Sequence, residues 1–327
     1  MLNRFTFILI ALLALANTAR GDVYLGADLL QDYPEGMQYY YEGEQLQKNW
    51  GKLHYRDSVD YPSADQLSAL LSPFFGTEHQ DEALPDQFNG DFSQLAPRVA
   101  EAWRLYHAGQ YKSAYELADT LGLAGALPKL RSLSIHHHFF VPPGDARRDA
   151  FAGLIKHMER MQEKFDLEMP AFYLLKAFAI GRYGQEINPV SAFTKGLGGK
   201  LKKNIYRAAE LAPNNVEAMM FKAVFHSEVT QHAGFTGRLL YGSNRDRALE
   251  DFEAATSESP QSTALLLEYG KACLKLCEKN PEQQSAHILH QLVSIPPKDM
   301  TDQQNIQLGK QVLEKKLAKK KSNSVNG

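Results

Sequence analysis

Cysteine and the common catalytic motifs are scarce in this chain of 327 residues. Only Cys273 and Cys277 are present, which excludes a disulfide-rich scaffold and a four-cysteine zinc site. The sequence contains no HExxH, GxSxG or GxxxxGK[ST] pattern, so the usual zinc-peptidase, serine-hydrolase and nucleotide-binding signatures are missing. We therefore expect a non-catalytic protein without a cofactor or a metal ion.

The two cysteines lie four residues apart on a helix predicted from Leu265 to Lys279. An oxidising compartment would favour a disulfide between them. However, two cysteines at i and i+4 on one continuous helix have poor geometry for a bridge. The sequence therefore predicts two buried free thiols.

Long apolar runs are also missing. The N-terminal run from Phe5 to Ala16 follows Arg4, precedes small residues, and is too short to span a bilayer comfortably. This pattern predicts a secretory signal peptide at residues 1–21. Cleavage after Ala16 or after Gly21 is compatible with it, and we prefer the latter; a retained membrane anchor is the alternative. We expect an exported protein, periplasmic or extracellular, with no stable membrane span.

Charge is unevenly distributed along the predicted mature chain. Residues 22–91 contain 14 acidic and three basic side chains, whereas the rest has a basic excess. Seven of the 15 tyrosines also lie between residues 22 and 61. We interpret residues 22–95 as an acidic, Tyr-rich irregular leader lying on the remainder of the chain, with one short helix from Ser63 to Leu71. The alternative is an adhesive arm for a partner. The charge difference predicts a contact that weakens as salt rises.

A packing motif recurs in the second half of the chain. Ala248, Phe252 and Ala255 precede Pro260, a small–bulky–small–proline frame that is typical of the second helix of a tetratricopeptide repeat. The same frame recurs upstream at Leu201, Ile205, Ala208 and Pro213. Small residues allow neighbouring helices to approach, and the proline ends the helix.

The motif and the flanking periodicity predict an all-α fold: a TPR-like right-handed solenoid of about five antiparallel helix pairs over residues 96–317, with a C-terminal capping helix. The predicted pairs are Val99–His107 with Tyr111–Leu121, Leu127–Phe139 with Ala146–Phe165, Pro170–Tyr183 with Lys200–Ala212, Val216–His232 with Arg245–Ser259, and Thr263–Glu278 with Gln283–Ser294. A helix capped at Thr301 and ending near Leu317 closes the stack, and residues 318–327 form a basic flexible tail. We interpret the tail lysines as a solvated helix end, and we expect no nucleic-acid partner.

Two insertions interrupt successive repeats between their helices. They span residues 184–199 and 233–243, and each contains glycine, an aromatic residue and a basic residue. Insertions at equivalent places in neighbouring repeats lie side by side, so they are candidates for a binding surface. The alternative is that they only pack against the helices. The candidate binding residues are Phe193, Lys195, Gly198, Gly199, Lys200, Phe235, Arg238, Tyr241 and Arg245.

Histidines give weaker indications of chemistry. His136, His137 and His138 are consecutive and point about 100° apart on a helix, so they cannot bind one metal ion together. We expect one of them to be partly buried and two exposed. His226 and Glu228 precede the second insertion and are secondary candidates for a catalytic or positioning role.

Several segments resemble known families. Residues 197–202, Pro213-Asn214-Asn215 and the second insertion are similar to exported bacterial tetratricopeptide proteins. Residues 265–276 and 295–300 resemble the last repeat of the eukaryotic regulators of microtubule dynamics, and a more distant similarity is to the periplasmic component of TRAP-type transporters. The resemblance implies a helical-repeat binding protein without catalysis.

Three functions are compatible with these observations. The first is an extracytoplasmic scaffold whose concave groove binds a protein or peptide partner. The second is a periplasmic protein accessory to a transport system, which binds a small anionic or amphipathic ligand at the two insertions. The third is an enzyme that uses His226 and Glu228. A pocket enclosed by residues 193–199 and 234–242 would favour the second, and an open polar groove the first.

Overall fold

The structure is a computed structural model that describes residues 23–54, 57, 59–86 and 88–325. The side chains of residues 189, 190, 193, 236 and 316–325 lie outside that description, as does the predicted signal peptide at residues 1–21. None of the described helices is long and apolar enough to cross a membrane.

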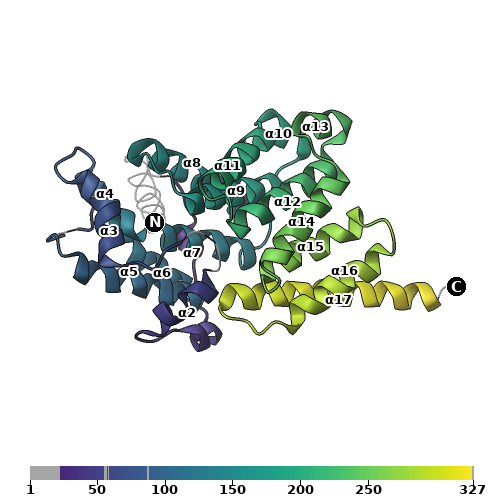
Figure 1. Cartoon of the computed structure of the whole chain (residues 1–327), viewed down its shortest axis with the longest axis horizontal. Coiled ribbons are helices and arrows are strands. Elements are labelled where there is room, and N and C mark those ends of the chain that lie inside the picture. Colours follow the sequence, from purple (N-terminus) through teal and green to yellow (C-terminus); the bar gives the residue numbers. More distant parts are fainter. Residues whose placement is uncertain (1–22, 55–56, 58, 87, 326–327) are drawn as a thin grey trace, which may run out of the picture.

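The described residues form α-helices, short 3-10 turns and no β-strand (Figure 1). The helices are α2 (Gln45–Leu53), α3 (Ala64–Leu71), α4 (Gln80–Ala83), α5 (Phe92–His107), α6 (Tyr111–Asp119), α7 (Ala126–Phe139), α8 (Asp145–Phe165), α9 (Pro170–Gln185), α10 (Pro189–Thr194), α11 (Leu197–Leu211), α12 (Val216–His232), α13 (Gly234–Tyr241), α14 (Arg245–Glu258), α15 (Thr263–Leu276), α16 (Pro281–Ser294) and α17 (Met300–Val325).

All ten helices predicted for the five pairs are present, most of them within a few residues of the expected bounds. Local capping explains this agreement. The side chains of Asn215 and Asn244 accept hydrogen bonds from the backbone N–H three residues later, both at 2.8 Å, and so begin α12 and α14. The side chain of Ser63 begins α3 in the same way. The two insertions each contain a short additional helix, α10 and α13.

The leader is more ordered than its composition predicts. It contains α2, α3 and α4, and the apolar side chains of α2 and α3 belong to the same core as α5 to α9. Leu46 and Trp50 are one turn apart on α2 and are both buried, and the Trp50 ring meets Trp103 of α5 edge-on at 5.5 Å. The prediction of an irregular segment over residues 22–95 was therefore wrong for these helices. Helix α5 begins at Phe92, because the Asp91 side chain caps the backbone N–H of Ser93.

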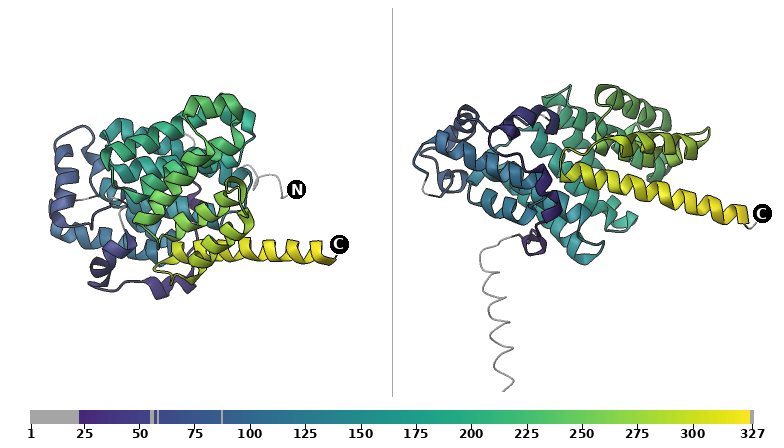
Figure 2. Two further views of the ribbon diagram at one scale, coloured as in Figure 1. Left: turned by 45° about the vertical axis from the view of Figure 1, so that its right-hand side comes forward. Right: turned by 90° about the horizontal axis from the view of Figure 1, so that it is seen from below.

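The end of the chain also differs from the prediction. Helix α17 begins at Met300 rather than after a Thr301 cap, because Asp299 Oδ1 accepts the backbone N–H of Asp302 at 2.7 Å. The helix continues to Val325, beyond the predicted end at Leu317, so residues 318–325 of the expected flexible tail are helical. No proline or glycine lies between the predicted end at Leu317 and Gly327. Figures 1 and 2 show α17 starting beside the leader and projecting away from the other helices.

The small residues of the repeat motif lie where helices meet. Ala248, Phe252 and Ala255 of α14 are fully buried and cluster with Ala223 of α12. The helices pack chiefly as α9 with α11, α12 with α14, and α15 with α16, as predicted. Pair two departs from this scheme, since α8 packs more extensively on α9 than on α7. The described residues thus form an all-helical arrangement in which α7, α9, α12 and α15 line a common cavity.

Candidate functional site

A cavity of about 1360 Å³ lies at the centre of the molecule. Its walls are the inward faces of α7, α9, α12 and α15, all of them first helices of the predicted pairs. Helix α11 and the insertions contribute to one end, and α2 with the start of α17 contributes to the other. The cavity is therefore assembled from segments that are far apart in the sequence.

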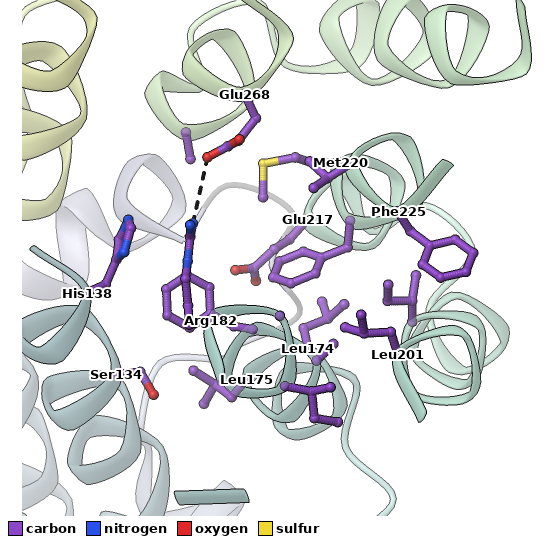
Figure 3. A pocket seen from close by; sticks show the side chains of 18 of the residues that line it. Ser134, His138, Leu174, Leu175, Arg182, Leu201, Glu217, Met220, Phe225 and Glu268 are labelled. Carbon is purple, nitrogen blue, oxygen red and sulfur yellow. Dashed lines mark ion pairs between the residues drawn. The ribbon is translucent and has the colours of Figure 1, made fainter. Parts of the chain in front are cut away.

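The end of the cavity near the insertions is apolar. It is lined by side chains of α9, α11 and α12, among them Leu174, Leu201, Met220 and Phe225 (Figure 3). Phe225 packs edge-on against Tyr241 of α13, with 5.5 Å between ring centroids. These side chains face the cavity because apolar residues cover nearly all sides of α9 and α12 rather than one stripe. An apolar wall of this kind favours the hydrocarbon part of a ligand.

A polar wall lies across the cavity from the apolar side chains (Figure 3). Arg182 of α9 approaches Glu268 of α15 at 3.7 Å, and Lys271 pairs with the same carboxylate at 3.0 Å. Burial opposes the ionisation of Glu268, but Lys271 and Arg182 outweigh it and hold its pKa below the usual value. Burial also lowers the pKa of the nearby His138 well below its ordinary value, so this imidazole is neutral at pH 7. Ser134, one turn before His138, places a buried hydroxyl without a hydrogen-bond partner at the same wall.

The opposite end of the cavity is closed by a buried polar network. His54 of the leader lies between Asp57 and His107, at 2.8 Å from Asp57 Oδ2 and 3.2 Å from His107 Nε2. The other ring nitrogen of His107 contacts Asp299 at 3.0 Å. Burial opposes ionisation of Asp299, but the hydrogen bond and the charge of His107 hold its pKa below the usual value. This chain connects the leader, α5 and the start of α17.

Arg131 of α7 extends that network to α12. Its guanidinium lies 3.3 Å from Asp57 and 3.4 Å from Glu217. Burial raises the pKa of Glu217 above its usual value even though Arg131 acts against it. Among the described residues, no three histidine, cysteine, aspartate or glutamate side chains are arranged to hold a metal ion.

The two insertions meet at the mouth of the cavity. Tyr241 lies against Gly198, where a Cβ atom would come within 2.6 Å of the tyrosine hydroxyl. Both residues line the cavity, together with Leu197 and Leu240. Glycine at position 198 therefore permits this close approach, since a side chain there would have to displace the Tyr241 ring.

The remaining predicted binding residues with described side chains lie outside the cavity. Phe235 and Arg238 are exposed on α13, and Gly199 is exposed on α11. Lys200 pairs with Glu159 at 3.2 Å, and Lys195 lies 5.9 Å from the ring centroid of Tyr183. Arg245 binds the backbone carbonyl of Leu276 and the carboxylate of Glu278, so it joins α14 to the end of α15. The side chain of Phe193 is outside the described residues.

The secondary candidates His226 and Glu228 do not form a site together. His226 is fully buried between Ser243, at 2.7 Å, and Tyr206, at 3.1 Å, and burial lowers its pKa to about 4. Glu228 is exposed and lies 3.7 Å from His232. Because His226 and Glu228 are two residues apart on α12, their side chains point in different directions.

Two expectations about individual residues were wrong. Of the three consecutive histidines, His136 and His137 are both buried and His138 is half-buried, because the leader covers α7. The backbone oxygen of Leu25 contacts His137 Nε2 at 2.8 Å, and the Tyr33 hydroxyl contacts His136 at 3.2 Å.

Cys273 and Cys277 form a disulfide rather than free thiols. Helix α15 ends at Leu276, so Cys277 has extended backbone and turns back toward Cys273. The i, i+4 argument fails because the pair is not on one continuous helix.

Sequence reasoning did not identify the residues of the polar wall. A signal was present, since Arg182 lies in α9 among residues that are otherwise mostly apolar and buried.

Comparisons with protein-family models and with curated proteins found no match for this chain.

Proposed function

We propose that this protein is a non-catalytic, exported binding protein that holds an amphipathic ligand in its central cavity. The observation that carries the proposal is a cavity of about 1360 Å³, with an apolar wall on one side, a polar wall on the other and the two insertions at its mouth. This volume exceeds the roughly 300–1,000 Å³ of common small-molecule sites, so it is sufficient for a long chain.

The fold that we propose for this role is a TPR-like right-handed solenoid. Burial of Ala248, Phe252 and Ala255 between helices supports it, as does the pairing of α9 with α11, α12 with α14, and α15 with α16. The disulfide between Cys273 and Cys277 supports export, because disulfides persist in oxidising compartments such as the periplasm. The separation of His226 from Glu228 favours binding over catalysis.

Neighbouring leucines on α13 provide a matched test. Leu240 lines the cavity and Leu239 does not, yet both are exposed, at 64% and 72%. A neutral apolar fluorophore, N-phenyl-1-naphthylamine, is expected to bind the full chain saturably. Leu240→Asp should weaken that binding about tenfold, whereas Leu239→Asp should bind like the wild type, and both should keep the wild-type melting temperature. Absence of saturable binding, or equal effects of the two substitutions, would contradict the proposal.

The second candidate is a scaffold whose concave face binds a peptide segment of a partner. It is favoured by the contribution of α7, α9, α12 and α15 to one continuous lining, since concave faces of repeat proteins bind extended segments. Displacement of the fluorophore distinguishes the two. A small amphiphile such as dodecanol displaces it under the first proposal. Under the second, an amphipathic helix of Leu, Glu and Lys displaces it and dodecanol does not.

A further inference from the structure

The polar wall carries hydrogen-bonding groups that the protein itself does not satisfy. Ser134 is fully buried, and its hydroxyl has no partner although it faces the cavity. The imidazole of His138 lies on the same face of α7, and within the described residues it makes no side-chain hydrogen bond. Arg182 reaches Glu268 only at 3.7 Å, which is longer than a hydrogen bond, and one of its five N–H groups donates to Gln185 at 3.1 Å. Buried polar groups are nearly always satisfied in native proteins, so the Ser134 hydroxyl, with the half-buried His138 and Arg182 beside it, indicates an acceptor supplied by a ligand.

The charge of Arg182 is incompletely compensated at this wall. Arg182 and Lys271 share the single carboxylate of Glu268. Glu228 is a second carboxylate that acts on Arg182, and Glu217 shares Arg131 with Asp57. Lys271 is exposed, whereas the Arg182 side chain is largely buried, and burial lowers the pKa of Arg182 below its ordinary value despite these carboxylates. A buried positive charge is costly unless it is fully paired, so Arg182 favours an anionic group at this wall.

We propose that the ligand is a single-chain amphiphile with one anionic head group built from oxygen atoms. The inference rests on the proposed function and specifies the chemistry of its ligand. The head group accepts hydrogen bonds from Ser134, His138 and Arg182. The hydrocarbon chain runs along Leu174, Leu201 and Phe225 toward the insertions (Figure 3). A carboxylate, as in a fatty acid, and a phosphate, as in a lipid head group, share this chemistry.

Calorimetric titration of the full chain with four dodecyl compounds tests the charge preference. The compounds are dodecanoate, dodecyl phosphate, dodecanol and dodecyltrimethylammonium, each below its micelle concentration. Both anions are expected to bind at least tenfold more tightly than the alcohol and the cation. Tighter binding of dodecanoate would identify a fatty acid as the source, and tighter binding of dodecyl phosphate a lipid phosphate. Equal binding of all four compounds would overturn the inference.

Two substitutions test the assigned residues. Ser134→Ala removes a hydroxyl that has no partner in the protein, so it should leave the melting temperature unchanged while weakening dodecanoate binding about three- to tenfold. The matched control is Ser132→Ala on the same helix, because Ser132 is equally buried but donates to Pro128 O at 2.7 Å and does not line the cavity. It should bind dodecanoate like the wild type. Arg182→Gln should reduce the preference for dodecanoate over dodecanol to less than threefold.

The outcomes separate this inference from the proposed function. If dodecanol and dodecanoate bind equally, and Ser134→Ala and Arg182→Gln bind like the wild type, the head-group assignment is wrong while the cavity remains a binding site. If none of the four compounds binds, the inference is also overturned, and the comparison of Leu240→Asp with Leu239→Asp decides the proposed function independently.

Discussion

Ala248 is one of the small residues through which α12 and α14 approach each other. Its side chain is fully buried in a cluster with Ala223 and Phe252. Ala248→Asp would place a carboxylate there without a partner, so we expect the free energy of unfolding to fall by about 3–5 kcal/mol. Urea denaturation monitored by circular dichroism measures this loss. Glu250→Ala, on the exposed side of the same helix, should change stability by less than about 0.5 kcal/mol. Equal stability of Ala248→Asp and the wild type would show that this residue is not at a helix contact.

His136 and His137 make the stability of the molecule depend on pH. Burial lowers the pKa of each to about 4, from the ordinary value of 6.5. The folded state therefore binds fewer protons than the unfolded state between these values, and stability is lost as pH falls from about 6.5 toward 4. The loss amounts to about 1.4 kcal/mol per pH unit for each histidine.

His136→Gln should remove one of these contributions and can keep a hydrogen bond to the Tyr33 hydroxyl. Between pH 7 and pH 5, the variant should lose about 2 kcal/mol less unfolding free energy than the wild type. Urea unfolding at the two pH values measures the difference. Equal losses in the two proteins would mean that His136 titrates alike in the folded and unfolded states.

At the scale of the single element, the disulfide connects the last turn of α15 to the residue that follows the helix. Cys273 is in the last turn of the helix and Cys277 is just beyond it, so the bridge closes a very short loop. Loop-closure entropy for so few residues is worth at most about 2 kcal/mol. We expect no thiol to react with Ellman's reagent in the oxidised protein and two to react after reduction. Reduction should lower the unfolding free energy by no more than that amount, and reactive thiols in the untreated protein would contradict the pairing.

The leader is held mainly by apolar and aromatic contacts rather than by net charge. Trp50 is 7% exposed and packs against Trp103, and Tyr33 stacks on Phe140 with 4.0 Å between ring centroids. The described ion pairs between the leader and the later helices include Asp57 with Arg131 and Glu82 with Lys164. Apolar and aromatic contacts respond weakly to salt, because salt screens only the interactions between charges.

We therefore expect trypsin to cleave the leader at similar rates in 0.05 M and 1 M NaCl, whereas the charge asymmetry alone predicts faster cleavage at high salt. Trp50→Ala should lower the unfolding free energy by about 3–5 kcal/mol and accelerate cleavage at both salt concentrations. Met37→Ala is the control in the same segment, because Met37 is 47% exposed. Strongly salt-dependent cleavage of the wild type would restore the electrostatic interpretation.

At the scale of the whole molecule, the start of α17 connects the C-terminal helices with the leader and α5. Met300 is fully buried against Gly109, where a Cβ atom would come within 2.6 Å of the methionine side chain. Asp299 contacts His107 across 192 residues of sequence, and Tyr39 donates to the Gln303 side chain at 2.9 Å. The start of α17 is therefore part of the core formed by the leader and α5.

Met300→Ala should lower the unfolding free energy by about 2–5 kcal/mol. Because the contact is long-range, hydrogen exchange should also accelerate in α5 and in the leader, far from the substitution in sequence. Lys310→Ala, on an exposed face of the same helix, serves as the control. Faster exchange confined to α17 would show that the leader is stabilised without the C-terminal helix.

The sequence by itself determined the helices of the five pairs and their order. Capping by Asn215 and Asn244, and the Ala248–Phe252–Ala255 spacing, act within one or two helical turns, so they can be identified without knowing the fold. The two insertions could be located in the same way, because they interrupt a regular period.

The tertiary structure alone decided which side chains meet. The polar wall combines Ser134, Arg182 and Glu268, which lie on three helices separated by tens of residues. The burial of His136 depends on a leader whose composition predicts an irregular segment, and the disulfide depends on where α15 ends. Each of these features is set by long-range packing, which local propensity and periodicity do not encode. A cavity is a property of how helices are placed in space, so the candidate site became visible only when the first helices of successive pairs came together around it.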